Sequence, residues 1–186
     1  MYFKHYEPIA KSEVCAIARA VRTYNAVVNF RGEEEPDGLD YIMYRLETTN
    51  HPLDGNELLK EWKGIEKLVA KVGQHEPLRT QNVVYFAILE NGVKCGETND
   101  IVQRYSNINK ETPIVRMWYL PVDSKEKGRI AEYALHQIFD HARGMERQRN
   151  KKDYYNCDVE YAKRFISNHG KKMYDAIIAA ILDNEE

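Results

Sequence analysis

Four side chains in the second half of the chain have the chemistry that phosphodiester hydrolysis requires: Tyr85, Lys94, Arg104 and Glu132. A carboxylate can hold a divalent cation that relieves charge on the phosphate and assists the leaving oxygen. A guanidinium fork matches the phosphate oxygens, and a tyrosine or lysine can position or deprotonate the attacking water when its pKa is lowered. The sequence offers a candidate for each of these tasks.

The first two candidates lie on a predicted β-hairpin. The apolar run VVYFAIL, residues 83–89, is followed by Asn-Gly at 91–92 and by a second run over 93–97. Asn-Gly between two such runs is the strongest short-range signal for a hairpin turn. The pattern therefore places Tyr85 on one strand and Lys94 on its neighbour.

The other two candidates lie on predicted helices. A helix that follows the hairpin carries Arg104 one turn from its start, and a later helix over 125–142 carries Glu132. An alternating strand is expected between them, over 113–122. These elements predict an α+β fold in which a small antiparallel three-stranded sheet is flanked by helices and preceded by a helical N-terminal region.

Helices are also predicted for most of the remaining chain. They are expected over 11–28, 55–72, 158–168 and 171–182, with short extended segments over 41–47 and 153–157. Gly170 is expected to separate the last two helices. The predicted organisation is a helical region over 1–76, a core domain over 82–170, and a C-terminal helix with an acidic tail over 171–186.

The order and spacing of these motifs resemble the GIY-YIG nuclease superfamily, in the phage and bacterial branch whose second strand reads K-I-G-x-T. The resemblance covers about residues 82–168. Val83-Val84-Tyr85 stands at the first motif and Lys94-Cys95-Gly96 at the second, and Arg104 lies eight residues past Gly96, as the helix arginine of the family does. The first motif lacks its leading glycine and the second has cysteine for isoleucine, so a non-cleaving member of the fold is the alternative.

The resemblance implies a metal-dependent endonuclease with Tyr85, Lys94, Arg104 and Glu132 as catalytic residues. Tyr85 would bind or activate the water, Lys94 would bind phosphate or share proton transfer, and Arg104 would clamp the scissile phosphate. Glu132 would hold a single Mg²⁺ or Mn²⁺, with water and phosphate as the other ligands. His136 lies on the same helix face, four residues further on, and would orient a partner or contact DNA.

Asp153-Tyr154-Tyr155 resembles the acidic-aromatic-aromatic stretch that closes the domain in this branch. The two tyrosines are expected to serve mainly in packing. Asn156 is a candidate for the late asparagine of the family.

A basic segment precedes this stretch, since residues 143–152 carry five basic groups against one acidic group. Such a segment can supply phosphate contacts, although the net charge of −2 is unlike that of a dedicated non-specific DNA binder. The candidate nucleic-acid-binding residues here are Arg143, Arg147, Arg149, Lys151 and Lys152.

The three cysteines are far apart and odd in number, which indicates neither a zinc site nor a disulfide framework. A reducing compartment is the simplest interpretation, so a cytoplasmic protein is expected, in the host cytoplasm if the protein is viral. The first 13 residues lack the apolar stretch of a signal peptide, and the apolar run over 176–182 is too short to span a bilayer. No membrane partner is expected.

Three functions remain open. The first is an endonuclease that acts on DNA, with RNA as the alternative substrate. The second is a binding protein that keeps the fold without turnover and grips nucleic acid or a protein partner, and the third is a structural domain whose motif match is chance. The four-residue set favours the first, because a scaffold needs neither a carboxylate nor an arginine at these positions.

Overall fold

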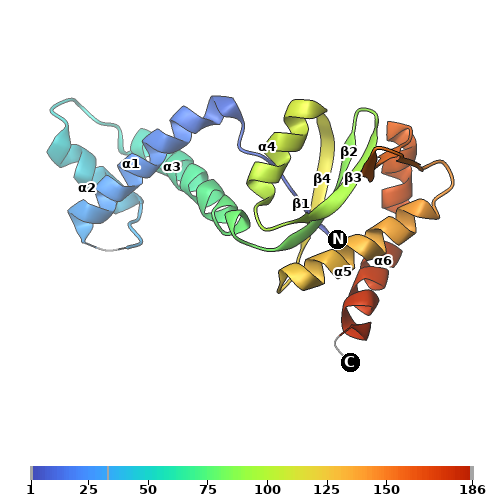
Figure 1. Ribbon diagram of the computed structural model, residues 1–186. Coiled ribbons are helices and arrows are strands. Elements are labelled where there is room, and N and C mark those ends of the chain that lie inside the picture. Colours follow the sequence, from blue (N-terminus) through green and yellow to red (C-terminus); the bar gives the residue numbers. More distant parts are fainter. Residues whose placement is uncertain (1, 33, 185–186) are drawn as a thin grey trace. The chain divides into compact units, whose positions relative to one another are not determined.

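The computed structural model describes residues 2–32 and 34–184. The chain forms two compact units, whose helices and strands are labelled in Figure 1. One unit is helical and comprises Ile9–Glu76, and the other contains the sheet and comprises the segment up to Pro8 together with the chain from Pro77 onward. The segment before Ile9, predicted to be part of the helical region, thus belongs to the sheet unit.

The helical unit is packed around an aromatic stack. Its helices are η1 Lys11–Glu13, α1 Val14–Arg31, α2 Gly38–Thr48 and α3 Gly55–His75. The indole of Trp62 stacks on Tyr24 and Tyr41, with ring centroids 5.4 and 5.2 Å away. Trp62 and Tyr41 are buried, so this stack forms the centre of the core of the unit.

Residues 41–47, predicted to be a short strand, lie inside helix α2. The helix begins at a capping box, in which Asp37 accepts hydrogen bonds from the backbone N–H groups of Leu39 and Asp40, and Asp40 accepts one from the N–H of Asp37. A short apolar stretch does not distinguish strand from helix by its periodicity alone. The cap is the feature that decides for the helix.

The sheet unit contains an antiparallel sheet of six strands in the order β1-β4-β2-β3-β6-β5. The strands are β1 Lys4–His5, β2 Val83–Leu89, β3 Gly92–Thr98, β4 Ile114–Pro121, β5 Glu146–Gln148 and β6 Lys151–Asn156. The prediction of three strands was therefore wrong. The expected strands β2, β3 and β4 form the centre, and the three added strands are too short or too polar to show apolar alternation.

The predicted hairpin of β2 and β3 is confirmed, but its turn lies one residue earlier than expected. Leu89 pairs with Gly92, so the turn residues are Glu90 and Asn91. Gly92 has a φ angle of 156°, and a Cβ atom there would lie 2.0 Å from the carbonyl oxygen of Tyr155 on β6. This glycine therefore allows β6 to approach β3 closely.

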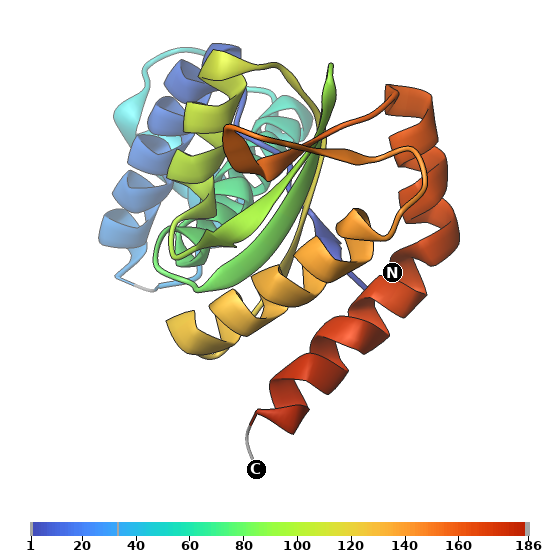
Figure 2. The same cartoon turned by 45° about the vertical axis from the view of Figure 1, so that its right-hand side comes forward.

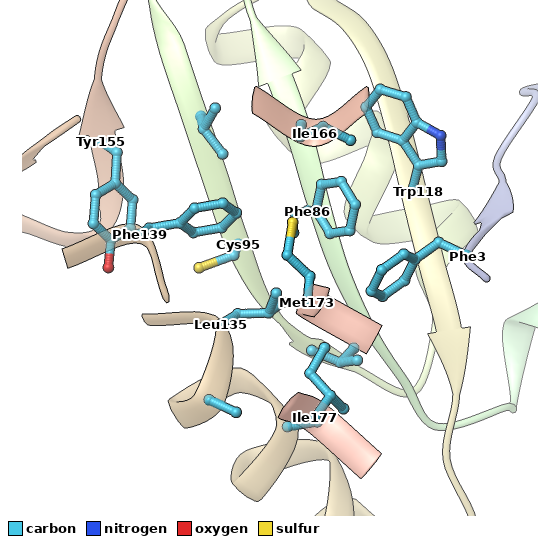
Figure 3. Packing of buried hydrophobic residues seen from close by; sticks show 14 of the residues in the cluster. Phe3, Phe86, Cys95, Trp118, Leu135, Phe139, Tyr155, Ile166, Met173 and Ile177 are labelled. Carbon is cyan, nitrogen blue, oxygen red and sulfur yellow. The ribbon is translucent and has the colours of Figure 1, made fainter. Parts of the chain in front are cut away.

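Helices cover both faces of the sheet (Figure 2). They are η2 Pro77–Arg79, α4 Ile101–Glu111, α5 Lys125–Asp140 and α6 Val159–Asp183. Helix α4 packs on the face that carries Tyr85 and the other odd-numbered residues of β2. Helices α5 and α6 pack on the opposite face, which carries Phe86 and Cys95 and forms the core shown in Figure 3.

Helix α6 continues through Gly170, where two separate helices were predicted. A glycine in a helix interior costs roughly 1 kcal/mol relative to alanine. The buried stripe of α6 offsets this cost, and its members are Ala162, Ile166, Met173, Ile177 and Ile181. The predicted boundary at 170–171 thus falls inside one helix. Over the described ranges, no helix has both the length and the apolar character needed to cross a membrane.

Gly92→Ala is expected to destabilise the sheet unit by about 2 kcal/mol or more, because the new Cβ atom collides with the backbone of β6. Gly170→Ala is the matched control: no atom lies within 4 Å of a Cβ there, and alanine should stabilise α6 by roughly 0.5–1 kcal/mol. Trp118 lies in the sheet unit and Trp62 in the helical unit. Chemical denaturation followed by Trp118 fluorescence in a Trp62→Phe background therefore measures both effects, and equal effects would contradict the packing at Gly92.

Candidate functional site

The candidate residues surround a stretch of sheet edge that is only partly covered. Strand β6 pairs with Gly92, Val93 and Lys94 of β3. In the part of the chain that the structure describes, residues 95–98 of β3 therefore have a neighbouring strand, β2, on one side only. Side chains from both faces of the sheet can approach one another around such an edge.

The Tyr85 ring is buried against the backbone of Gly96. The two residues lie opposite each other on β2 and β3, and a Cβ atom at position 96 would lie 2.8 Å from the phenol oxygen. Glycine is thus the residue that leaves room for the ring. Tyr85 is 1% exposed, and its phenol oxygen lies beside the backbone of Gly96.

Burial raises the pKa of the Tyr85 phenol far above its usual value, and the nearby Arg104 lowers it by a smaller amount. Asp153, Cys95 and Glu132 add to the increase. The phenol therefore keeps its proton at neutral pH. The sequence suggested Tyr85 as a group that activates water, whereas its surroundings make it a hydrogen-bond donor.

Lys94 is buried, with 6% of its surface exposed, and two neighbours on β6 hold its ammonium group. Asp153 forms an ion pair with it. The ring of Tyr154, the residue opposite Lys94 on β6, has its centroid 4.0 Å from Nζ. Lys94 is thus fixed in position by a carboxylate and an aromatic face.

Arg104 differs from Lys94, because its charge has no such partner. It is half-buried on α4, and it forms no ion pair with any residue in 2–32 or 34–184. Its guanidinium group lowers the pKa of both Tyr85 and Tyr154, so it lies within electrostatic reach of the two phenols. A guanidinium group without a carboxylate partner beside hydrogen-bonding phenols is suited to bind a phosphate.

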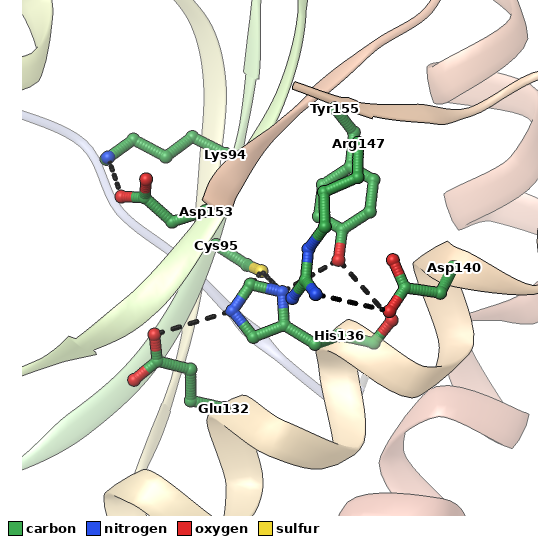
Figure 4. A network of polar contacts seen from close by, with 8 residues as sticks. All are labelled: Lys94, Cys95, Glu132, His136, Asp140, Arg147, Asp153 and Tyr155. Atoms are coloured by element: carbon green, nitrogen blue, oxygen red, sulfur yellow. Dashed lines mark hydrogen bonds and ion pairs between the residues drawn. The ribbon is translucent and has the colours of Figure 1, made fainter. Parts of the chain in front are cut away.

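Glu132 and His136 belong to a polar network on α5 (Figure 4). Nε2 of His136 lies 3.6 Å from Oε1 of Glu132, and Nδ1 lies 2.7 Å from the hydroxyl of Tyr155 on β6. The Tyr155 contact fixes the imidazole ring, which in turn faces the carboxylate. The imidazole thus lies beside Glu132, and it is mostly buried, with a side-chain exposure of 13%, so it is poorly placed to contact DNA directly.

Cys95 also contacts His136, with 3.5 Å between Sγ and Nδ1. The cysteine is buried, and burial raises the pKa of its thiol far above the usual value, with a further increase from Glu132. The thiol therefore stays protonated at neutral pH. A buried, protonated thiol is a poor nucleophile, because the thiolate is the reactive form.

The helices that carry Arg104 and Glu132 lie on opposite faces of the sheet, so the candidate residues do not all lie on one face. No direct contact joins the two side chains in the described part of the molecule. Both, however, are among the charged groups that act on the pKa of the Tyr85 phenol.

The basic segment 143–152 forms the β5–β6 hairpin, and two of its cations already have partners. Arg147 lies 3.5 Å from Asp140 and stacks over the Tyr155 ring. Lys151 lies 3.9 Å from Glu111. The remaining basic residues of the segment, all exposed and none in an ion pair within the described ranges, are Arg143, Arg149 and Lys152.

Glu132 is the residue that the sequence nominated to hold a metal ion. No group of three or more His, Cys, Asp or Glu side chains in the described residues could hold such an ion. Mg²⁺ commonly binds through one or two carboxylates together with water and substrate phosphates. A single half-buried carboxylate beside a phosphate site fits that donor set.

Sequence reasoning missed the role of β6 in this site. It interpreted Tyr154 and Tyr155 as packing residues, yet one holds Lys94 and the other holds His136. Sequence reasoning assigned no separate role to Asp153, which pairs with Lys94. The usable signal was the extended segment expected over 153–157, because neighbouring residues on a strand face opposite sides of the sheet, which puts Tyr154 and Tyr155 on different faces.

The site therefore combines an unpaired guanidinium, a neutral phenol, a fixed ammonium and an oriented carboxylate near one sheet edge. Such a set can bind a phosphate and, through the carboxylate, a divalent cation next to it. Comparisons of the chain with models of protein families, with curated proteins and with solved structures found no match.

Proposed function

We propose that this protein is a metal-dependent endonuclease of the GIY-YIG type that hydrolyses phosphodiester bonds, with DNA as the expected substrate and RNA as the alternative. The observation that carries the proposal is the environment of Tyr85. A protonated phenol lies within electrostatic reach of an unpaired cation, Arg104, and of a carboxylate, Glu132. A phosphate next to the phenol would contact Arg104 directly and Glu132 through a metal ion.

Arg104 would hold the scissile phosphate through two parallel hydrogen bonds, the geometry for which a guanidinium fork is suited. Tyr85 would donate a hydrogen bond to the phosphate or to the attacking water, since its phenol stays protonated. Lys94 would add a fixed positive charge from the neighbouring strand. Tyr85 and Lys94 are held before substrate arrives, which is the condition for effective electrostatic stabilisation of a transition state.

Glu132 would hold Mg²⁺ or Mn²⁺, and the ion would supply charge relief at the phosphate and at the leaving oxygen. His136 keeps the Glu132 carboxylate in place, and Tyr155 keeps His136 in place. Ligand orientation by such outer contacts is usual at metal sites.

A non-cleaving binding protein is the second candidate function, and one observation favours it. Arg104 and Glu132 approach from opposite faces of the sheet, so the cation that grips a phosphate does not require the carboxylate. In that case the protein would bind nucleic acid equally well with and without a divalent metal, and it would release the strand uncut.

Glu132→Gln is expected to reduce cleavage at least about 100-fold, because loss of the carboxylate removes metal-borne charge stabilisation worth several kcal/mol. Binding measured in EDTA should be unchanged or slightly tighter, since a negative charge near the phosphate is gone. Arg104→Ala should instead weaken both binding and cleavage. The assay is nicking of supercoiled plasmid with Mg²⁺, Mn²⁺ or EDTA, beside a binding titration.

Glu126→Gln, which removes another carboxylate from α5, is the control for this experiment, and thermal melting checks folding. If the native protein cleaves neither DNA nor RNA with either metal, the binding protein becomes the better conclusion. If the native protein cleaves and folded Glu132→Gln cleaves equally well, Glu132 is not the metal ligand.

Tyr85→Phe is expected to slow cleavage about 10- to 100-fold, the effect of one hydrogen bond to a charged group. The pH dependence of the remaining activity should keep the shape seen in the native protein. The reason is that the raised pKa leaves the phenol protonated throughout the neutral range, so it contributes no titration there. If the native protein shows a pH-dependent rise in activity between about pH 6 and 9 and Tyr85→Phe lacks it, Tyr85 is the base instead.

Arg149 and Arg147 offer a matched pair for nucleic-acid binding, because both lie in the β5–β6 hairpin and only Arg147 has an acidic partner. Arg149→Ala should weaken binding. It should also reduce the slope of the logarithm of the binding constant against the logarithm of salt concentration by about 0.9, the value for one lost phosphate contact on duplex DNA. Arg147→Ala should change the slope less. The measurement is fluorescence anisotropy of a labelled duplex over a range of salt concentrations, and equal slopes for all three proteins would show that the hairpin does not touch the phosphates.

A further inference from the structure

Lys94 stands out because a buried ammonium group needs compensation. The residue is 6% exposed, and removing an ammonium from water is costly unless a partner of opposite charge accompanies it. Within the described ranges the carboxylate that does so is Asp153 on β6. The side chain of Asp153 is itself 40% exposed, so it is a surface carboxylate that reaches inward.

The surroundings of Nζ leave part of its hydrogen-bonding capacity for a ligand. An ammonium group has three donors. Asp153 accepts from one of them, and the Tyr154 ring, with its centroid 4.0 Å from Nζ, attracts the charge without accepting a conventional hydrogen bond. A phosphate oxygen could therefore join Asp153 as a second acceptor.

The ion pair is part of the candidate site and not a distant surface feature. Asp153 is among the groups that act on the pKa of the Tyr85 phenol, together with Arg104 and Glu132. Asp153 and Arg104 also both act on the pKa of Tyr154. The carboxylate that holds Lys94 is thus within electrostatic reach of the same phenols as the unpaired guanidinium group.

We infer that Asp153 is a positioning residue, which holds the Lys94 ammonium against Tyr154 so that it contacts a phosphate of the bound nucleic acid. The inference rests on the proposed function for the identity of the ligand, but it concerns binding and does not require cleavage. It assigns to Asp153 a role opposite to that expected from its charge. A carboxylate near a phosphate site normally weakens anion binding by repulsion.

The two roles predict opposite outcomes for Asp153→Asn. If the carboxylate only repels phosphate, its removal should tighten binding. If it positions Lys94, its removal leaves a buried ammonium without compensation, and the group must leave its place or lose its proton. Binding should then weaken even though a negative charge has been removed from the site.

The experiment measures binding of a labelled DNA duplex, and of RNA of the same sequence, in EDTA over a range of salt concentrations. We expect Lys94→Gln and Asp153→Asn each to weaken binding about three- to tenfold and to flatten the salt slope by about 0.9 on duplex DNA, the value for one lost phosphate contact. The double variant should be no weaker than either single variant, because both changes remove the same contact. Asp153→Glu, which keeps the charge, should recover most of the loss.

Glu146→Gln is the control, because it removes a carboxylate from the edge strand β5 of the same hairpin, which β6 separates from β3 and Lys94. It should leave binding unchanged or tighten it. Thermal melting identifies any variant that fails to fold. If Asp153→Asn does not fold, the double variant replaces it in the comparison, because the double variant carries no uncompensated buried charge. Its salt slope is expected to equal that of Lys94→Gln.

Tighter binding by Asp153→Asn, or additive losses in the double variant, would overturn the inference. So would failure of the native protein to bind either nucleic acid. If the native protein binds but does not cut, the enzymatic proposal fails while the binding pattern of these variants still decides the role of Asp153.

Discussion

The register between β2 and β3 is the constraint on which the candidate site depends. Tyr85 lies opposite Gly96 and Lys94 lies opposite Ala87, so the two large side chains on this face each have a small cross-strand neighbour. A shift by one residue would put a side chain opposite the Tyr85 ring and would turn Lys94 to the other face. Gly92 adds a second requirement, because β6 can bring Asp153 and Tyr154 to Lys94 only if no Cβ atom blocks its approach.

The same alternation explains why the site extends around an edge. Along β3, Lys94 and Gly96 face α4 whereas Cys95 faces α5, where it contacts His136. Groups on α4 and α5 can therefore act on a common ligand only beside the part of β3 with which β6 does not pair. The short pairing of β6 leaves residues 95–98 of β3 with one neighbouring strand in the described part of the chain, while Tyr154 and Tyr155 contact Lys94 and His136.

The elements with strong local signals were predictable from the sequence. Two apolar runs around Asn-Gly gave the hairpin, and the caps at Asp100 and Ser124 begin the helices that carry Arg104 and Glu132. What could not be predicted depends on contacts between distant segments. The pairing of β6 with β3, the partners of Arg147 and Lys151 in Asp140 and Glu111, and the raised pKa of Tyr85 all arise from residues brought together only by the fold.

The charges at the site bear on the choice between a nuclease and a binding protein. Asp153 compensates Lys94, so Arg104 is the cation of the candidate site that has no carboxylate partner among the described residues. A protein that only gripped a phosphate backbone would gain nothing from a further carboxylate within electrostatic reach of the same phenol, since a carboxylate repels phosphate. A divalent cation between carboxylate and phosphate turns that repulsion into attraction. The presence of Glu132 therefore supports the proposed metal-assisted hydrolysis more than binding alone.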